Sequence, residues 1–211
     1  MKSLVILISG RGSNMKALIE ARLPFHIKAV ISNRPDAKGL AIADANNIPT
    51  RVIDHKNFAS REAFDAALSA EIDVLDADFI VLAGFMRVLS EGFVNRYPRR
   101  IINIHPSLLP SFPGLHTHER ALKAGVKVHG CTVHFVMAAL DHGPIIIQAA
   151  VPVLPGDNAA TLAARVLKEE HGIYAQALRW LAEGRVEFLP GDVVQIKSAI
   201  ADSGSFIVPK V

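Results

Sequence analysis

The chain has a single cysteine, Cys131, among 211 residues. One thiol excludes an internal disulfide framework and is typical of proteins from a reducing compartment. Cys131 lies in an apolar stretch, which favours a buried thiol without a chemical role. Long hydrophobic runs are also missing, because none reaches the length that a membrane-spanning helix needs. We therefore expect a cytoplasmic protein without membrane contact.

The sequence has no strong excess of either charge. Its 23 Lys and Arg residues nearly balance its 20 Asp and Glu residues, which gives a formal net charge of +3. A surface for nucleic acid needs a basic stripe, usually with aromatic side chains between the charges. Here the basic residues are scattered, and Arg99-Arg100 is the one tight pair. We therefore expect no nucleic-acid partner.

Short apolar runs alternate with helical segments in the first two-thirds of the chain. Strands are expected at 4–9, 27–32, 51–54, 79–82 and 101–104, and helices at 13–22, 38–46, 61–75 and 91–96. Continuous apolar runs that are separated by helices predict a parallel sheet covered on both faces.

The pattern changes after residue 126. Strand-like runs at 127–137 and 144–153 are joined by a connection too short for a crossover helix, which predicts an antiparallel pair. A long helix is expected at 158–183. Together these features predict an α/β protein with a Rossmann-like, mostly parallel twisted sheet and an antiparallel C-terminal portion.

We expect one domain over residues 1–211. Its parts would be a nucleotide-binding or phosphate-binding half at 1–100, a catalytic half at 101–185, and a C-terminal tail at 186–211. In open α/β sheets, ligands bind beyond the carboxyl ends of the strands, so residues that directly follow strands are the best candidates for a site.

The loop Ser9–Asn14 joins the first expected strand to the first expected helix. Its glycines would let the backbone approach an anion, and a helix start offers unpaired N–H groups. A tight turn capped by Ser13 or Asn14 would explain the loop equally well. A dinucleotide is disfavoured because Met15 stands where a third glycine is needed, and the ending Gly-Lys-Ser/Thr of triphosphate loops is absent. A phosphate monoester fits better.

Asn103 and His105 lie two residues apart at the end of an expected strand, so their side chains share a face. An amide beside an imidazole can stabilise a tetrahedral oxyanion and move protons. A histidine that is merely hydrogen-bonded at a strand end is the simpler interpretation of His105 taken alone.

The motifs together resemble the signature of the folate-dependent formyltransferases. The longest match is Asn-x-His-Pro-Ser-Leu-Leu-Pro at 103–110, followed by Asp-x-Gly-Pro at 141–144. Residues 8–14 resemble the family's phosphate loop, 83–87 its folate-facing turn, and 113–118 the loop after the catalytic strand. The resemblance extends from the first strand to about residue 183.

The resemblance implies roles for the matching positions. The catalytic trio would be Asn103, His105 and Asp141. The phosphoribosyl amine would be bound by Gly12, Ser13, Asn14, Gly84, Pro106 and Glu170. The folate would be bound by Asn103, Arg61, Met86, Arg87, Val88, Leu89, Met137, Ala138, Ala139 and Leu140. The chain departs from the family pattern at Ala138-Ala139, where a more acidic pair is expected, and at His142, which replaces a small residue.

The implied activity is transfer of the formyl group of 10-formyltetrahydrofolate, the co-substrate, to the amine of glycinamide ribonucleotide in purine synthesis. Asn103 and protonated His105 would stabilise the oxyanion, and Asp141 would favour the imidazolium form of His105. The one assembly considered is a homodimer. Two alternatives stay open: a hydrolase that deformylates formyltetrahydrofolate with water, and a nucleotide-binding module without catalysis.

Several other histidines could suggest a metal site. His116, His118, His129 and His134 lie within one short stretch of the chain. Structural zinc sites usually include cysteines, however, and the helical His-Glu-x-x-His motif is missing. We therefore expect structural or surface histidines and no metal.

Overall fold

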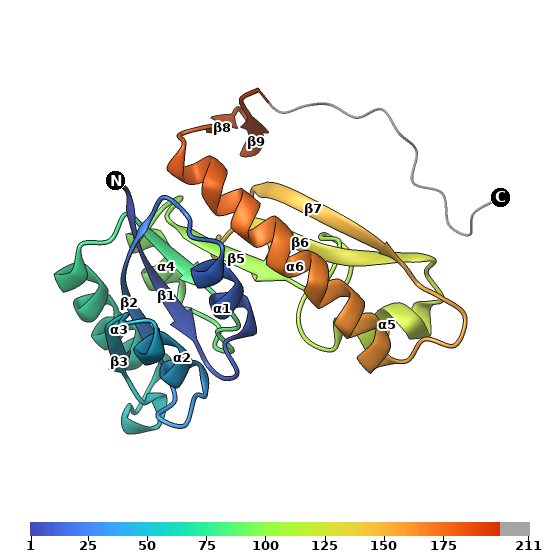
Figure 1. Ribbon diagram of the computed structural model, residues 1–211. Helices are drawn as coiled ribbons and strands as arrows, with labels where there is room; N and C mark the ends of the chain where they lie inside the picture. The colour runs from blue at the N-terminus through green and yellow to red at the C-terminus, as the bar shows by residue number, and fades with distance from the viewer. Residues whose placement is uncertain (199–211) are drawn as a thin grey trace. The chain divides into compact units, whose positions relative to one another are not determined.

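The computed structural model describes residues 1–198, so the last part of the predicted tail lies outside the described residues (Figure 1). The chain forms two compact units: the first comprises residues 1–103 and 135–140, and the second comprises 104–134 and the residues from 141 onward. The single domain over 1–211 and its division into parts at 1–100, 101–185 and 186–211 stay predictions.

The strands form a seven-stranded mixed sheet with the order β3-β2-β1-β4-β5-β6-β7 and a two-stranded sheet of β8 and β9. The strands of the first unit are β1 (Ser3–Ile8), β2 (His26–Ser32), β3 (Thr50–Val52), β4 (Phe79–Leu82) and the start of β5 (Ile101–His105). Their pairings are all parallel. This confirms the predicted mostly parallel sheet.

Helices cover both faces of the sheet in the first unit. They are α1 (Ser13–Glu20), α2 (Gly39–Ala45), α3 (Arg61–Leu75) and α4 (Glu91–Arg96), with a short 3-10 helix at His55–Asn57. Ser60 and Ser90 cap α3 and α4, because each hydroxyl accepts a backbone N–H of the first turn. The predicted helix 61–75 agrees with α3 at both ends.

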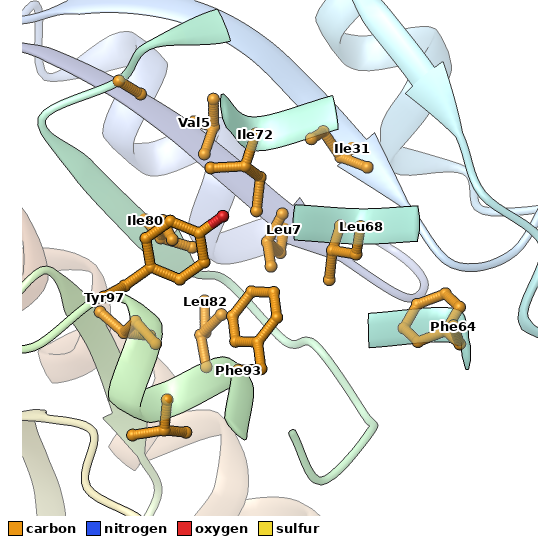
Figure 2. Packing of buried hydrophobic residues seen from close by; sticks show 13 residues of the cluster. Val5, Leu7, Ile31, Phe64, Leu68, Ile72, Ile80, Leu82, Phe93 and Tyr97 are labelled. Carbon is orange, nitrogen blue, oxygen red and sulfur yellow. The ribbon is translucent and has the colours of Figure 1, made fainter. Parts of the chain in front are cut away.

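The core of the first unit lies between the sheet and helices α3 and α4 (Figure 2). Every residue of β1 is buried, and its alternate residues Val5 and Leu7 belong to this core. Phe64, Leu68 and Ile72 repeat at helical spacing along α3 and pack against those strands. On the opposite face, Gly39 of α2 packs against Ile8. The core fixes the carboxyl ends of β1 and β4 side by side.

The second unit contains α5 (Thr117–Ala124), β6 (Val128–Phe135), β7 (Ile145–Pro152), α6 (Ala159–Ala182), β8 (Val186–Leu189) and β9 (Val193–Ile196). Strands β6 and β7 pair in the predicted antiparallel sense. The expected long helix corresponds to α6, whose start is closed by a capping box of Asn158 and Thr161.

The structure differs from the sequence pattern at two elements. Helix α5 is not expected from the pattern, because it is short, mostly polar and buries only Thr117 and Ala121. The predicted C-terminal tail, for which no element is named above, begins with an antiparallel hairpin of β8 and β9. No helix within residues 1–198 is long and apolar enough to cross a membrane.

Candidate active site

The phosphate-loop candidate lies at the carboxyl ends of β1 and β4, in the first unit. The backbone N–H of Ser9 donates to the Gly84 carbonyl at 3.1 Å, and the N–H of Met86 donates to the Ser9 hydroxyl at 2.7 Å. The Ser9 hydroxyl in turn donates to Asn33 Oδ1 at 2.6 Å. The loop after β1 and the turn after β4 therefore form one hydrogen-bonded substructure at the point where the strand order reverses.

Gly12 is the N-cap residue of α1, and no side chain caps this helix. Its φ of 74° lies in the left-handed region, and a Cβ atom there would be 2.8 Å from the Gly39 Cα atom. Both facts require glycine. Ser13 and Asn14 lie in the first turn of α1 instead of capping it. A helix start whose N-cap residue has no side chain offers its backbone N–H groups to an anion.

Two segments of the first unit present exposed apolar side chains. Met86 and Val88 are 67% and 49% exposed, and Met137 and Leu140 are 44% and 54% exposed. Their neighbours Phe85, Leu89 and Val136 pack against the core, so the segments themselves are anchored. Exposed apolar residues on anchored segments are typical of a ligand wall. Ala138 and Ala139 are exposed between Met137 and Leu140.

The remaining folate candidates of the first unit lie on α3 or against it. Arg87 stacks its guanidinium over the Phe64 ring, 4.9 Å from the ring centroid. This cation–π contact holds Arg87 against α3. Arg61 is exposed at the first residue of the same helix.

His105 is the last residue of β5 and is 6% exposed. Its Nε2 atom lies 3.1 Å from the carbonyl oxygen of Phe112. A carbonyl can only accept a hydrogen bond, so the Nε2 atom of His105 carries a proton. The Nδ1 atom lies 3.6 Å from Asp141 Oδ1, and both side chains are nearly buried.

Asp141 is fixed from its other oxygen. Its Oδ2 atom accepts the backbone N–H of Gly114 at 2.6 Å, and its φ of 50° is left-handed. The distance of 3.6 Å between His105 Nδ1 and Asp141 Oδ1 exceeds a hydrogen-bond distance, so Nδ1 stays available to a further hydrogen-bond partner.

The loop after β5 is stiffened by a second set of hydrogen bonds. The Thr132 hydroxyl of β6 donates to the Ser107 carbonyl at 2.7 Å and accepts the N–H of Leu109 at 3.0 Å. Gln148 of β7 donates to both the Leu109 carbonyl and the Thr132 hydroxyl. This network holds Pro106 and the residues that follow it at the end of the strand.

Glu170 lies in the buried stripe of α6, one turn from Val166 and one turn from Tyr174. It is 7% exposed, which is rare for a carboxylate and requires compensating interactions. Cys131 of β6 is fully buried, and burial together with the charge of Glu170 raises the pKa of its thiol to about 12. Cys131 is therefore an inert thiol at neutral pH, as the sequence predicts.

His118 and His129 lie together in the second unit, with ring centroids 5.3 Å apart in an edge-to-face arrangement. Burial lowers the pKa of His118 and lowers the pKa of His129 to about 4, so both rings are neutral at pH 7. Within residues 1–198, no group of three or more His, Cys, Asp or Glu side chains is arranged to hold a metal ion.

The structure brings together His105, Asp141 and the loop that follows β5, all within the second unit, and Asn103 lies two residues before His105 on β5. Two partners of the trio are backbone groups, the Phe112 carbonyl and the Gly114 N–H, which no side-chain motif reveals. A Rossmann-like sheet whose β5 ends in this arrangement defines a class of group transferases. A family model described as formyl transferase matches residues 1–178, and the chain belongs to that family.

Known proteins with related sequences point to one member of the family. The chain is 49% identical over 189 residues to phosphoribosylglycinamide formyltransferase of Escherichia coli K12, covering 88% of this chain and 89% of that protein. It is 48% identical to the trifunctional purine biosynthetic protein adenosine-3 of Drosophila melanogaster, where the match covers 90% of this chain and 14% of that protein.

Solved structures agree with the sequence matches. Glycinamide ribonucleotide transformylase 1 from Symbiobacterium toebii has a TM-score of 0.89 and 48% identity, covering 93% of this chain and 94% of that one. A formyltetrahydrofolate deformylase from Pseudomonas syringae pv. tomato has a TM-score of 0.85 but only 30% identity, covering 92% of this chain and 65% of that one.

Proposed function

We propose that this protein is an enzyme that transfers the formyl group of 10-formyltetrahydrofolate to the amine of glycinamide ribonucleotide. The observation that carries this proposal is the buried His105, whose Nε2–H is committed to the Phe112 carbonyl while Nδ1 faces Asp141. Relatives of about half-identical sequence that are named for this reaction support the choice of substrates.

The proposed reaction needs little more than positioned polar groups. The amine nitrogen forms a bond to the formyl carbon, and the carbonyl oxygen becomes an oxyanion. Asn103 and the Nδ1–H of His105 stabilise that oxyanion, with Asp141 beside the ring. The bond between the formyl carbon and the folate nitrogen then breaks. One proton passes from the attacking amine to the leaving nitrogen, by way of Asp141 and water.

The ligands are assigned to the remaining predicted residues. The α1 N-terminus at Gly12, Ser13 and Asn14, with Gly84 beside it, is proposed to bind the phosphate. Glu170 and Pro106 are proposed to contact the rest of the phosphoribosyl amine. The residues proposed to bind the folate are Asn103, Arg61, Met86, Arg87, Val88, Leu89, Met137, Ala138, Ala139 and Leu140.

The cellular location, the assembly and the metal requirement of the enzyme are part of the same proposal. A cytoplasmic location fits relatives that act in purine biosynthesis. The homodimer stays a prediction, and the proposed reaction uses no metal.

The experiment measures release of deformylated folate from 10-formyltetrahydrofolate with and without glycinamide ribonucleotide. Release that strictly requires the amine establishes the transferase. Equal release without it identifies the deformylase, and binding of the nucleotide without any release identifies a binding module.

Asn103→Ala and His105→Ala test the oxyanion assignment in the same assay. Each is expected to lower kcat by about two to three orders of magnitude, because each removes one oxyanion donor. The KM values for both substrates are expected to change much less. A variant that retains wild-type kcat would remove that residue from the mechanism.

A further inference from the structure

The loop of residues 112–116, here named the anchor loop, has an unusual backbone. Phe112, Gly114 and His116 all have positive φ angles, of 54°, 78° and 56°. For the two residues that carry a side chain, this conformation is strained and persists only when the surroundings hold it in place.

The anchor loop supplies both fixed partners around His105. The Phe112 carbonyl accepts the ring Nε2–H at 3.1 Å. Two residues later, the Gly114 N–H donates to Asp141 Oδ2 at 2.6 Å, while the other oxygen of Asp141 faces the ring Nδ1. A shift of the loop would therefore move the hydrogen-bond acceptor on one side of the imidazole and the carboxylate on the other side together.

Arg120 of α5 holds the loop from outside. Its guanidinium donates to the carbonyl of Pro113 and, at 3.4 Å, to the carbonyl of Leu115. It also lies over the Phe112 ring, 5.7 Å from the centroid. These contacts engage the loop before and after Gly114.

His129 of β6 holds the loop from the interior. Its ring is 1% exposed and meets the Phe112 ring edge-to-face, with centroids 5.9 Å apart and an interplanar angle of 72°. Neither ring nitrogen of His129 has a hydrogen-bond partner of good geometry, although the Pro106 backbone lies near enough to oppose the fall of its pKa. The role of this ring is therefore packing rather than hydrogen bonding.

We propose that Arg120 and His129 are positioning residues that lock the anchor loop and thereby hold both partners of His105. Neither residue needs to touch a substrate in this assignment. The inference rests on the proposed function for its kinetic consequence, but its structural consequence is independent of the reaction.

The kinetic test compares matched variants of the full chain. Arg120→Met keeps the length of the side chain but removes the donors and the ring contact. It is expected to lower kcat about tenfold or more with little change in either KM, because molecules in which the anchor loop has shifted lack the fixed geometry around His105. Arg120→Lys, which retains a charged donor, is expected to recover part of that loss. Lys123→Met, an exposed change further along α5, is the control and is expected to be neutral.

The packing role of His129 is tested by comparing an aromatic replacement with a small one. His129→Phe preserves the ring against Phe112 and is expected to keep kcat within about twofold, whereas His129→Ala is expected to lower it. The folded fraction is checked by circular dichroism at the assay temperature. If Phe and Ala replacements lower kcat equally, the packing role is wrong.

The structural test follows the Nε2 proton of His105 by ¹⁵N-edited NMR, assigned by its loss in His105→Ala. A proton donated to a buried carbonyl exchanges slowly with water, and its signal is expected to disappear in Arg120→Met and to persist in Lys123→Met. A persisting signal in Arg120→Met would overturn the proposal. If the wild-type protein transfers no formyl group, the proposed function fails while this test still decides the role of Arg120.

Discussion

His129 is almost fully buried in β6, and burial lowers the pKa of its ring from 6.5 to about 4. The unfolded chain therefore binds a proton at this residue between pH 6.5 and 4, while the folded chain does not. The contribution of neutral His129 to the free energy of unfolding is fully present above pH 6.5 and is lost as the pH falls toward 4.

His129→Phe is expected to remove this pH dependence. Between pH 7.5 and 4.5, the free energy of unfolding of the wild type should fall by about 2–3 kcal/mol more than that of the variant, since one pKa unit corresponds to 1.36 kcal/mol. Urea unfolding at several pH values measures both curves. Parallel curves for the two proteins would show that His129 is not protonated on unfolding in this range.

Side chains that carry the proposed chemistry are the part of the candidate site that sequence can predict. Asn103, His105 and Asp141 stand in a motif that marks chemistry, and Glu170 is a charged residue in an apolar helical stripe. Phe112 is different, because its contribution is a carbonyl in the left-handed region. The side chain of Phe112 gives no sign that its carbonyl is used, so this contact could be found only from the fold.

Among the elements, α6 positions Glu170 through its own start. The Asn158 side chain accepts the N–H groups of Ala160 and Thr161, and the Thr161 hydroxyl accepts the N–H of Asn158 in return. This reciprocal cap satisfies backbone donors that would otherwise lack partners. The cap therefore fixes the start of α6 at Asn158, whereas the apolar periodicity alone locates that start only approximately.

Asn158→Ala is expected to lower the free energy of unfolding by about 1 kcal/mol, because the side-chain acceptor of the cap is lost. Asn158→Ser keeps an acceptor and serves as the matched control. Thermal and urea unfolding of both variants provide the measurement. Equal stability of the Ala and Ser variants would show that the capping box contributes little.

Element types followed from the sequence where apolar runs were long. Strand β1 has every residue buried, and α3 repeats large apolar residues at helical spacing. Helix α5 buries only two residues, so its periodicity is too weak to identify. Its position is set by the left-handed residues His116 and Gly125 that flank it.

For the molecule as a whole, ligand binding is expected to raise the free energy of unfolding. A ligand that binds only the folded chain at about 100 times its Kd adds about 2.7 kcal/mol. Glycinamide ribonucleotide is therefore expected to raise the Tm of the wild type at saturating concentration.

Gly12→Ala is expected to abolish most of that rise. Alanine at this position would keep a strained, positive φ, and its Cβ atom would lie 2.8 Å from the Gly39 Cα atom. The start of α1 must therefore shift. Differential scanning fluorimetry with and without the nucleotide measures the effect, and Gly92→Ala, whose Cβ meets nothing within 4 Å, is the control. An unchanged ligand-induced rise in Gly12→Ala would contradict the phosphate assignment.

One short segment, the anchor loop, makes both backbone hydrogen bonds that fix His105 and Asp141. An enzyme molecule in which that segment has opened retains neither hydrogen bond, so there is no half-assembled site. We expect loosened variants to behave as a mixture of competent and incompetent molecules in slow exchange. In a single turnover, the amplitude of the fast phase would then fall while its rate constant stays the same, and the lost activity would be a matter of population rather than of barrier height.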